Sequence, residues 1–138
     1  MISENEQFLV HLARRVAQQE RKMVREIREL AGTEENYLVF IREYDRVQEQ
    51  LVRARYLQAR ATLTLAEWFA TLVHFRWRCA YCQEKPFQVL HHFTPRSQGG
   101  TSADNCVPAC YSCARSRARE DTHVQAYLSA IKQDLFSL

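Results

Sequence analysis

Two pairs of cysteines with the same internal spacing are the residues of this 138-residue chain that most clearly indicate chemistry. A Cys-x-x-Cys turn places two thiolates on one side of a tight loop, and two such turns complete the tetrahedral sulfur shell that zinc prefers. A shell filled by protein ligands belongs to a structural site rather than a catalytic one. The sequence therefore predicts a structural zinc ion, with a redox dithiol or two unrelated packed pairs as alternatives. The predicted ligands are Cys79, Cys82, Cys110 and Cys113.

A pair of adjacent histidines, His91 and His92, lies between the two cysteine pairs and follows the apolar residues Val89 and Leu90. On a strand, neighbouring side chains point to opposite faces, so the two histidines could serve two different roles only if the strand ends or twists at that point. Metal-assisted cleavage of a phosphodiester needs one group that holds a cation and another that takes a proton from water. An adjacent pair at a strand end can supply both. The alternative is a pair of surface or packing histidines.

The remaining cysteine, Cys106, stands beside Val107 and Pro108. These neighbours favour a small buried apolar residue over a ligand or a nucleophile. The beginning of the chain, MISENEQ, is acidic and polar where a secretory signal would be basic and then apolar. We therefore expect a cytoplasmic protein with reduced cysteines.

Glycine and proline divide the chain into unlike parts, because only Gly32 falls within residues 1–85 whereas Pro86 to Pro108 contains five such residues. The first part should therefore be helical and the later stretch irregular or hairpin-like. Apolar residues recur every seven positions over residues 3–30, which predicts one helix, and a second is predicted over 34–60. Together they suggest a helical hairpin. Its apolar faces would pack within the chain or form the seam of a homodimer.

Two further helices are predicted on either side of the cysteine-rich segment. The stretch TLAE, with Thr64 and Glu67, has the pattern of a capping box and opens a helix to about Phe75. An amphipathic helix begins near Asp121. The fold class is therefore α+β and mainly α. We expect a helical hairpin over 1–62, which would act as an interaction or dimerisation arm, and a zinc-stabilised domain with a C-terminal helix over 63–138.

The composition, 46% hydrophobic and 25% charged, is that of an ordinary globular protein, and no apolar run approaches the ~18 residues of a membrane-spanning helix. We therefore expect no membrane partner. The net charge is only +3, but residues 76–119 carry seven basic side chains against Glu84 and Asp104. A local positive field favours a phosphate-bearing partner.

The stretch from Thr64 to Arg119 resembles an HNH endonuclease of the ββα-metal type with a four-cysteine zinc elaboration. The matching features, in order, are TLAEW, CAYC, HH followed by PRSQGG, then DN, ACYSC and a basic helix. The resemblance implies a nuclease that hydrolyses phosphodiester bonds in DNA with Mg²⁺ or Mn²⁺. It implies that His92 is the general base, that His91 ligates the catalytic cation, and that Asn105 holds the loop and the base in place.

One position departs from the family's pattern. The residue directly after the final cysteine is normally a histidine or asparagine that ligates the catalytic metal, whereas this chain has Ala114. Alanine has no donor atom, so one of two protein ligands is missing. Natural or engineered inactivation would explain it, as would replacement by water or by His123. We rank replacement by His123 lower, because nothing in its spacing favours it.

Three arginines are candidates for contacts to nucleic-acid phosphates. Arg96 lies in the loop after the histidines, whereas Arg115 and Arg119 are four residues apart and share one face of a helix. Such contacts give affinity and position without reading sequence. The alternative is solvated surface charge. The sequence therefore predicts a metal-dependent endonuclease, weakened or inactivated at Ala114, and the rival is a non-catalytic zinc module that binds nucleic acid or protein.

Overall fold

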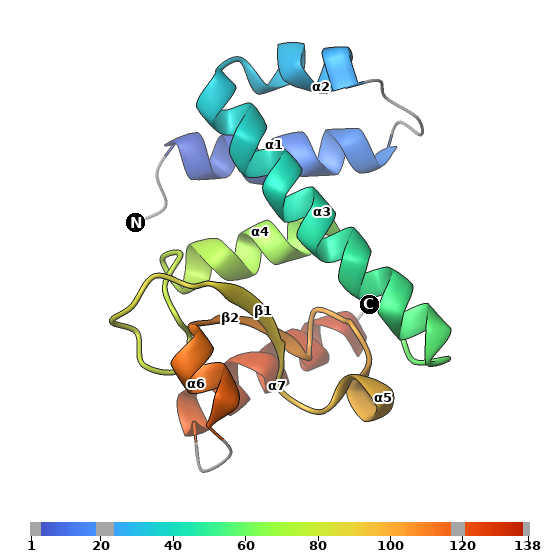
Figure 1. Cartoon of the computed structure of the whole chain (residues 1–138), viewed down its shortest axis with the longest axis vertical. Coiled ribbons are helices and arrows are strands. Elements are labelled where there is room, and N and C mark those ends of the chain that lie inside the picture. The colour runs from blue at the N-terminus through green and yellow to red at the C-terminus, as the bar shows by residue number, and fades with distance from the viewer. Residues whose placement is uncertain (1–3, 19–23, 117–120, 137–138) are drawn as a thin grey trace.

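The computed structural model describes residues 4–18, 24–116 and 121–136. It is mainly helical and contains a small two-stranded antiparallel sheet, so the predicted fold class is confirmed. In Figure 1 the N-terminal helices form the upper part, and the sheet lies below them among the later helices. The elements, in chain order, are α1 (Glu4–Gln18), α2 (Val24–Ala31), α3 (Glu34–Tyr56), α4 (Leu65–His74), β1 (Val89–His92), α5 (Arg96–Gly99), β2 (Cys106–Ala109), α6 (Tyr111–Arg115) and α7 (Thr122–Phe136).

The N-terminal segment corrects the expectation of a two-helix hairpin, because α1 and α2 replace the single helix predicted over 3–30. In Figure 1 these two helices run in opposite directions across the top of the molecule. The arrangement brings Leu9 and Leu12 of α1 and Ile27 of α2 to one core, where all three are buried. These three side chains are thus covered within one chain, and the structure gives homodimerisation no support.

The long helix α3 begins after the predicted break at Gly32, whose φ is +82°, but it ends at Tyr56, earlier than expected. Its end is a left-handed turn in which Gln58 has a φ of +58°. The amide of Ala59 donates to the carbonyl of Ala54 at 2.9 Å, a hydrogen bond typical of a helix that closes with a Schellman motif. This turn stops the helix and directs the chain toward α4.

One buried cluster joins the N-terminal helices to α4. The predicted capping box is confirmed, since Thr64 and Glu67 exchange hydrogen bonds between side chain and backbone. It starts a helix whose Trp68 and Phe69 are fully buried, with the Phe69 ring 6.2 Å from that of Phe40 on α3. The division of the chain after residue 62 stays a prediction, but the two segments share this core.

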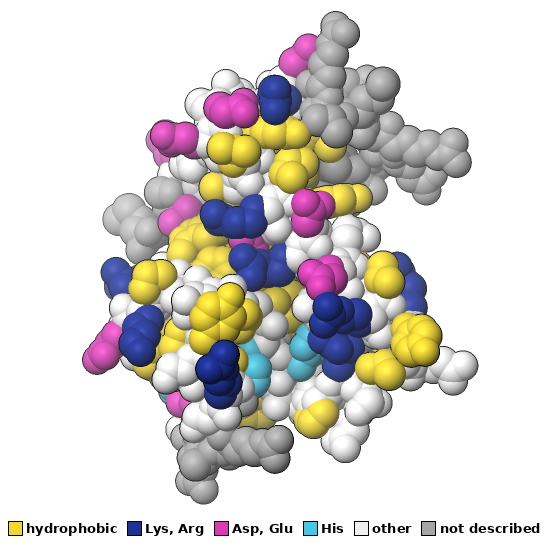
Figure 2. Space-filling model, viewed as in Figure 1, with side chains coloured by type: hydrophobic (Ala, Val, Ile, Leu, Met, Phe, Trp, Pro, Cys, Tyr) yellow, Lys and Arg dark blue, Asp and Glu magenta, His cyan; other side chains and the backbone are white. Residues whose placement is uncertain are grey.

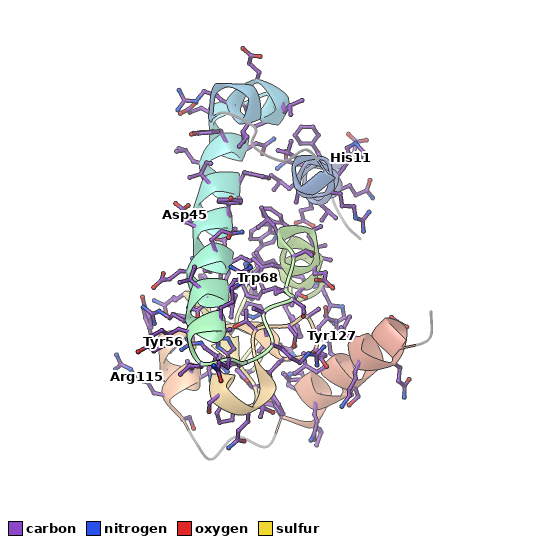
Figure 3. All side chains as sticks on the ribbon, turned by 90° about the vertical axis from the view of Figure 1, so that its right-hand side faces the viewer. His11, Asp45, Tyr56, Trp68, Arg115 and Tyr127 are labelled. Carbon is purple, nitrogen blue, oxygen red and sulfur yellow. The ribbon has the colours of Figure 1, made fainter. Side chains whose placement is uncertain are left out.

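A fully buried carboxylate ties α3 to α4. Glu43 of α3 accepts a hydrogen bond from the indole Nε1 of Trp68 at 3.0 Å, and Figure 3 shows Trp68 lying between the two helices. Arg42 and Arg46 pair with the same carboxylate at 2.9 and 2.8 Å. A buried charge persists only when it is paired and hydrogen-bonded, and Glu43 satisfies both conditions.

The sheet separates two clusters of buried side chains. Strands β1 and β2 pair antiparallel, with His91 opposite Val107 and His92 opposite Cys106. Leu90 and Cys106 belong to the cluster shared with the N-terminal helices. Val107 belongs to a second cluster with the cysteine turns and α7, whose other buried members are Cys79, Ala80, Tyr81, Ala109, Cys110, Val124 and Leu128. Because side chains alternate along a strand, the two histidines face different clusters.

Candidate metal centre and active site

The four predicted zinc ligands converge from two turns. Cys79 and Cys82 lie in the turn before β1, and Cys110 and Cys113 lie at the start of α6. Their Sγ atoms all lie within 4.8 Å of one another. A tetrahedral ion with Zn–S bonds of about 2.3 Å separates its sulfurs by roughly 3.8 Å, so a small contraction completes the shell. The four cysteines are therefore positioned to bind a zinc ion.

Hydrogen bonds between nearby residues shape each of the two cysteine turns. In the first, the amide of Gln83 donates to the carbonyl of Cys79 at 2.9 Å, and Gln83 takes a left-handed φ of +59°. In the second, Cys110 is the N-cap of α6, and its Sγ accepts from the amide of Cys113 at 3.4 Å. A hydrogen bond to Sγ stabilises a negative sulfur, so the second turn suits a thiolate at Cys110.

Two cysteines differ sharply in acidity. Burial opposes the ionisation of Cys82, but hydrogen bonds from the backbone of Lys85 and Glu84 outweigh it and lower its pKa to about 7. Burial raises the pKa of Cys106 to about 12. Cys106 also lies outside the group of four cysteines and is buried in the cluster shared with the N-terminal helices. It is therefore the buried apolar residue that its neighbours in the sequence indicate.

The adjacent histidines point to opposite sides of β1. On the side of the cysteine turns, the Tyr81 hydroxyl lies 3.0 Å from Nδ1 of His91, and the two rings meet edge to face. On the other side, Nε2 of His92 lies 2.9 Å from Oγ1 of Thr101. Both histidines are half-buried at the end of the strand. The structure thus gives them separate surroundings, which two different chemical roles would require.

The surroundings of His92 keep its imidazole neutral. Burial and then the charges of Arg96 and His91 lower the pKa of His92 from 6.5 to about 4. Its partner Thr101 is fully buried and donates in turn to the carbonyl of Gln50 on α3 at 3.3 Å. A helix from the N-terminal segment therefore forms part of the wall around His92.

Asn105 holds the loop between β1 and β2. Its Oδ1 accepts from the amide of Thr94 at 2.7 Å, and its Nδ2 donates to the carbonyls of Thr94 and Gly100 at 2.9 and 2.8 Å. The side chain is buried, and a Cβ placed on Gly99 would lie 2.6 Å from Nδ2. The loop therefore closes around Asn105 and leaves no room for a side chain at Gly99.

The position of the missing ligand, Ala114, lies half-buried on α6 directly after the last zinc ligand. His123 of α7 has other partners, since its Nε2 donates to the carbonyl of Ala80 at 2.8 Å and its Nδ1 lies 3.6 Å from Asp121. It also lines a cavity of about 520 Å³ together with His74 and arginine side chains. Both ring nitrogens of His123 thus lie beside protein oxygens.

The predicted phosphate contacts lie on both sides of β1. Arg96 on α5 donates to Oε1 of Gln50 at 2.6 Å, and Arg115 on α6 is exposed. Arg119 lies outside the described residues. In Figure 1 β1 runs between α6 and the group formed by α5 and the end of α3, and Figure 2 shows histidine side chains near the middle of this face with basic side chains on either side.

Residues 79–120 match the family model described as HNH endonuclease. The matched segment contains both cysteine pairs, the histidines and Asn105, so the resemblance is confirmed over this part of the chain and supports a nuclease-type or nucleic-acid-related function. Helices α1 to α4 lie outside the match. Comparisons with curated proteins and with solved structures gave no match. Among the residues that the structure describes, no helix has both the length and the apolar character to cross a bilayer.

Three residues at the site were not singled out from the sequence: Tyr81, Thr101 and Gln50. Tyr81 lies inside the first cysteine motif, and Thr101 follows the two glycines of the loop. Their position beside a motif is the feature of the sequence that could have identified both as site residues. Gln50 gave no such signal, because it is one of two glutamines in α3 and lies far from the motif in the chain.

Proposed function

We propose that this chain is an HNH-type endonuclease, a cytoplasmic hydrolase that cleaves phosphodiester bonds in DNA with His92 as the general base. The observation that carries the proposal is the placement of a neutral, oriented imidazole at a strand end within the HNH-matching segment. A general base must be unprotonated at the working pH and held toward the proton it takes. The lowered pKa and the hydrogen bond to Thr101 supply these two conditions.

The hydrogen bonds of Thr101 indicate which nitrogen accepts the proton. Its hydroxyl donates to the carbonyl of Gln50, so the same oxygen accepts from Nε2–H of His92. Nδ1 of His92 then carries the lone pair and takes the proton of the attacking water. Gln50 and Thr101 hold the tautomer, as an orienting group does for a catalytic imidazole.

The catalytic cation would be Mg²⁺ or Mn²⁺ at His91, and when bound it would stabilise negative charge on the leaving oxygen. Tyr81 would fix the His91 ring through Nδ1, as the outer partners of metal-bound histidines do. The donor set of the chain falls one ligand short, because Ala114 offers no atom. Cation binding, and with it activity, is therefore weakened or lost in this sequence.

Asn105 and the arginines complete the site. By closing the loop, Asn105 keeps Thr101 against His92. Arg96 and Arg115 on either side of β1, with Arg119 further along the chain, would contact phosphates and position the strand. Contacts of this kind suit DNA but do not by themselves exclude RNA.

A second candidate is a non-catalytic zinc module that binds nucleic acid or protein. The observation that favours it is Ala114, since a binding module needs no second ligand for a catalytic cation. The two functions differ in one measurement, which is nicking of supercoiled plasmid DNA with Mg²⁺ or Mn²⁺ by the chain and by Ala114→His. Nicking that increases in the variant supports the endonuclease, whereas plasmid binding without nicking in both supports the module.

A further inference from the structure

The C-terminal end of α3 carries an exposed apolar surface beside the candidate active site. Val52 and Tyr56 of α3 and the following Leu57 are 60%, 87% and 46% exposed. We call these three residues the α3 shelf. Figure 3 shows Tyr56 at the end of the helix, on the outside of the molecule. A tyrosine this exposed contributes little to the folded core.

The α3 shelf borders a shallow cavity of about 330 Å³ that is also lined by Arg53 and Arg96. Arg53 pairs with the carboxylate of Glu49 at 2.6 Å, so part of its charge is compensated. The side chain of Arg96 donates to the neutral side chain of Gln50, and among the described residues its buried Nε has no hydrogen-bond partner. The remaining donors of this guanidinium can form charge-assisted hydrogen bonds with an anionic partner such as a phosphate.

Hydrogen bonds link Arg96, at the edge of the cavity, to the site around His92. Gln50 accepts the hydrogen bond of Arg96 through its side chain and that of Thr101 through its carbonyl, and Thr101 contacts His92. The charge of Arg96 also acts on the His92 imidazole. A strand whose phosphate lies at Arg96 would therefore pass from the candidate active site to the α3 shelf.

We propose that the α3 shelf binds an unpaired base of a nucleic-acid strand, with the ring of Tyr56 stacked on the base and Arg96 on a neighbouring phosphate. The inference rests on the proposed function and narrows its substrate to strands that are single or locally unpaired. Aromatic rings beside basic residues bind single strands in this way, because every base has a face that can stack. In an intact duplex the bases are stacked on one another and out of reach.

The test compares oligonucleotides of equal length, single-stranded and duplex, labelled with a fluorophore and titrated without added divalent cation so that no cleavage occurs. Stacking contributes about 1–3 kcal/mol per base, so Tyr56→Ala should weaken single-strand binding roughly 5- to 150-fold and leave duplex binding nearly unchanged. Tyr56→Phe keeps the ring and should bind as the parent chain does. Leu38→Ala, on another exposed apolar side chain near the other end of α3, is the matched control and should change neither affinity.

A second variant distinguishes the phosphate contact from base stacking. Arg96→Gln should weaken the binding of both oligonucleotides and reduce the salt dependence of single-strand binding, the slope of log K against log salt concentration, by about 0.7. Unchanged single-strand affinity in Tyr56→Ala, while the parent chain still binds, would overturn this inference and leave the proposed function standing. Failure of the parent chain to bind either oligonucleotide would overturn both. Dissociation of a dimer by Tyr56→Ala with oligonucleotide affinity intact would instead identify the shelf as a protein interface.

Discussion

Nε2 of His92 lies 2.9 Å from the hydroxyl of Thr101, and that hydroxyl donates to the carbonyl of Gln50 on α3. The contact joins the HNH-matching segment to a helix outside it. It gives α3 a second role besides packing, because the helix backbone fixes the hydroxyl that fixes the imidazole. Helix α3 therefore forms part of the candidate active site.

Replacing Thr101 by valine should disturb both the fold and the site. Valine has the same shape but no hydroxyl, so Nε2 of His92 loses its partner, and the carbonyl of Gln50 loses its hydrogen bond from Thr101. An unsatisfied buried group costs about 1–3 kcal/mol, and we expect a fall of that size in the free energy of unfolding, measured in urea. Thr101→Ser keeps the hydroxyl and should retain most of the stability. Equal stability of the valine variant and the parent would show that the contact is incidental.

The cysteine tetrad predicts one zinc ion per chain by elemental analysis. Replacing Cys79, Cys82, Cys110 or Cys113 by serine should lower the zinc content and unfold the region around β1 and β2, because metal binding supplies folding free energy to such sites. The matched control is Cys106→Ala, a buried cysteine outside the tetrad, which should keep its zinc. Folded parent protein without zinc would contradict the assignment.

The buried carboxylate of Glu43 predicts that α3 and α4 depend on one another. Glu43→Ala leaves the indole of Trp68 without its acceptor and breaks two ion pairs. Leaving the buried indole N–H without an acceptor costs about 1–3 kcal/mol, and the cavity left by the missing side chain adds to the loss. Glu49→Ala, which breaks an exposed pair on the same helix, should cost less than about 1 kcal/mol. Similar losses in the two variants would mean that Glu43 does not join the helices as the structure indicates.

The lowered pKa of His92 predicts a dependence of stability on pH. The unfolded imidazole takes up a proton near pH 6.5, whereas the pKa of folded His92 is about 4. The neutral ring therefore favours the fold above pH 6.5, and this contribution is lost as the pH falls toward 4. The midpoint temperature of thermal unfolding of the parent chain should fall as the pH is lowered over this range, and that of His92→Gln should fall less. An NMR titration that places the pKa of His92 near 6.5 would contradict the account.

Much of the later half of the molecule could be predicted from the sequence, because its signals are local. The cap at Thr64 and the two cysteine turns depend on residues a few positions apart, and each leads to the expected element. The break between α1 and α2 could not be predicted, since the heptad-like pattern continues through residues 19–23 and does not show where a helix turns back.

The residues that surround His92 could not be predicted from the sequence for a different reason. Gln50 and Thr101 lie 51 positions apart in the sequence, and only the packing of α3 beside the loop brings them together. Likewise, the sequence alone gives no sign that Glu43 is more than one charged residue of a polar helix, because its contact with Trp68 is seen only in the structure. Contacts that form only when distant elements pack together produce no recognisable pattern of spacing in the sequence.

The most direct measurement of the central claim is nicking of supercoiled plasmid DNA with Mn²⁺ by four proteins: the parent chain, Ala114→His, Ala114→His with His92→Ala, and Ala114→His with His91→Ala. Restoring the ligand should raise the rate of nicking above that of the parent chain. Loss of a general base typically costs about 10²–10⁴-fold, so the double variant with His92→Ala should nick no faster than the parent. The double variant with His91→Ala should also lose the gain, because it binds the cation weakly, and high Mn²⁺ should partly restore its nicking. If Ala114→His folds and binds Mn²⁺ yet cuts no DNA, or if it cuts equally well without His92, the catalytic account is wrong.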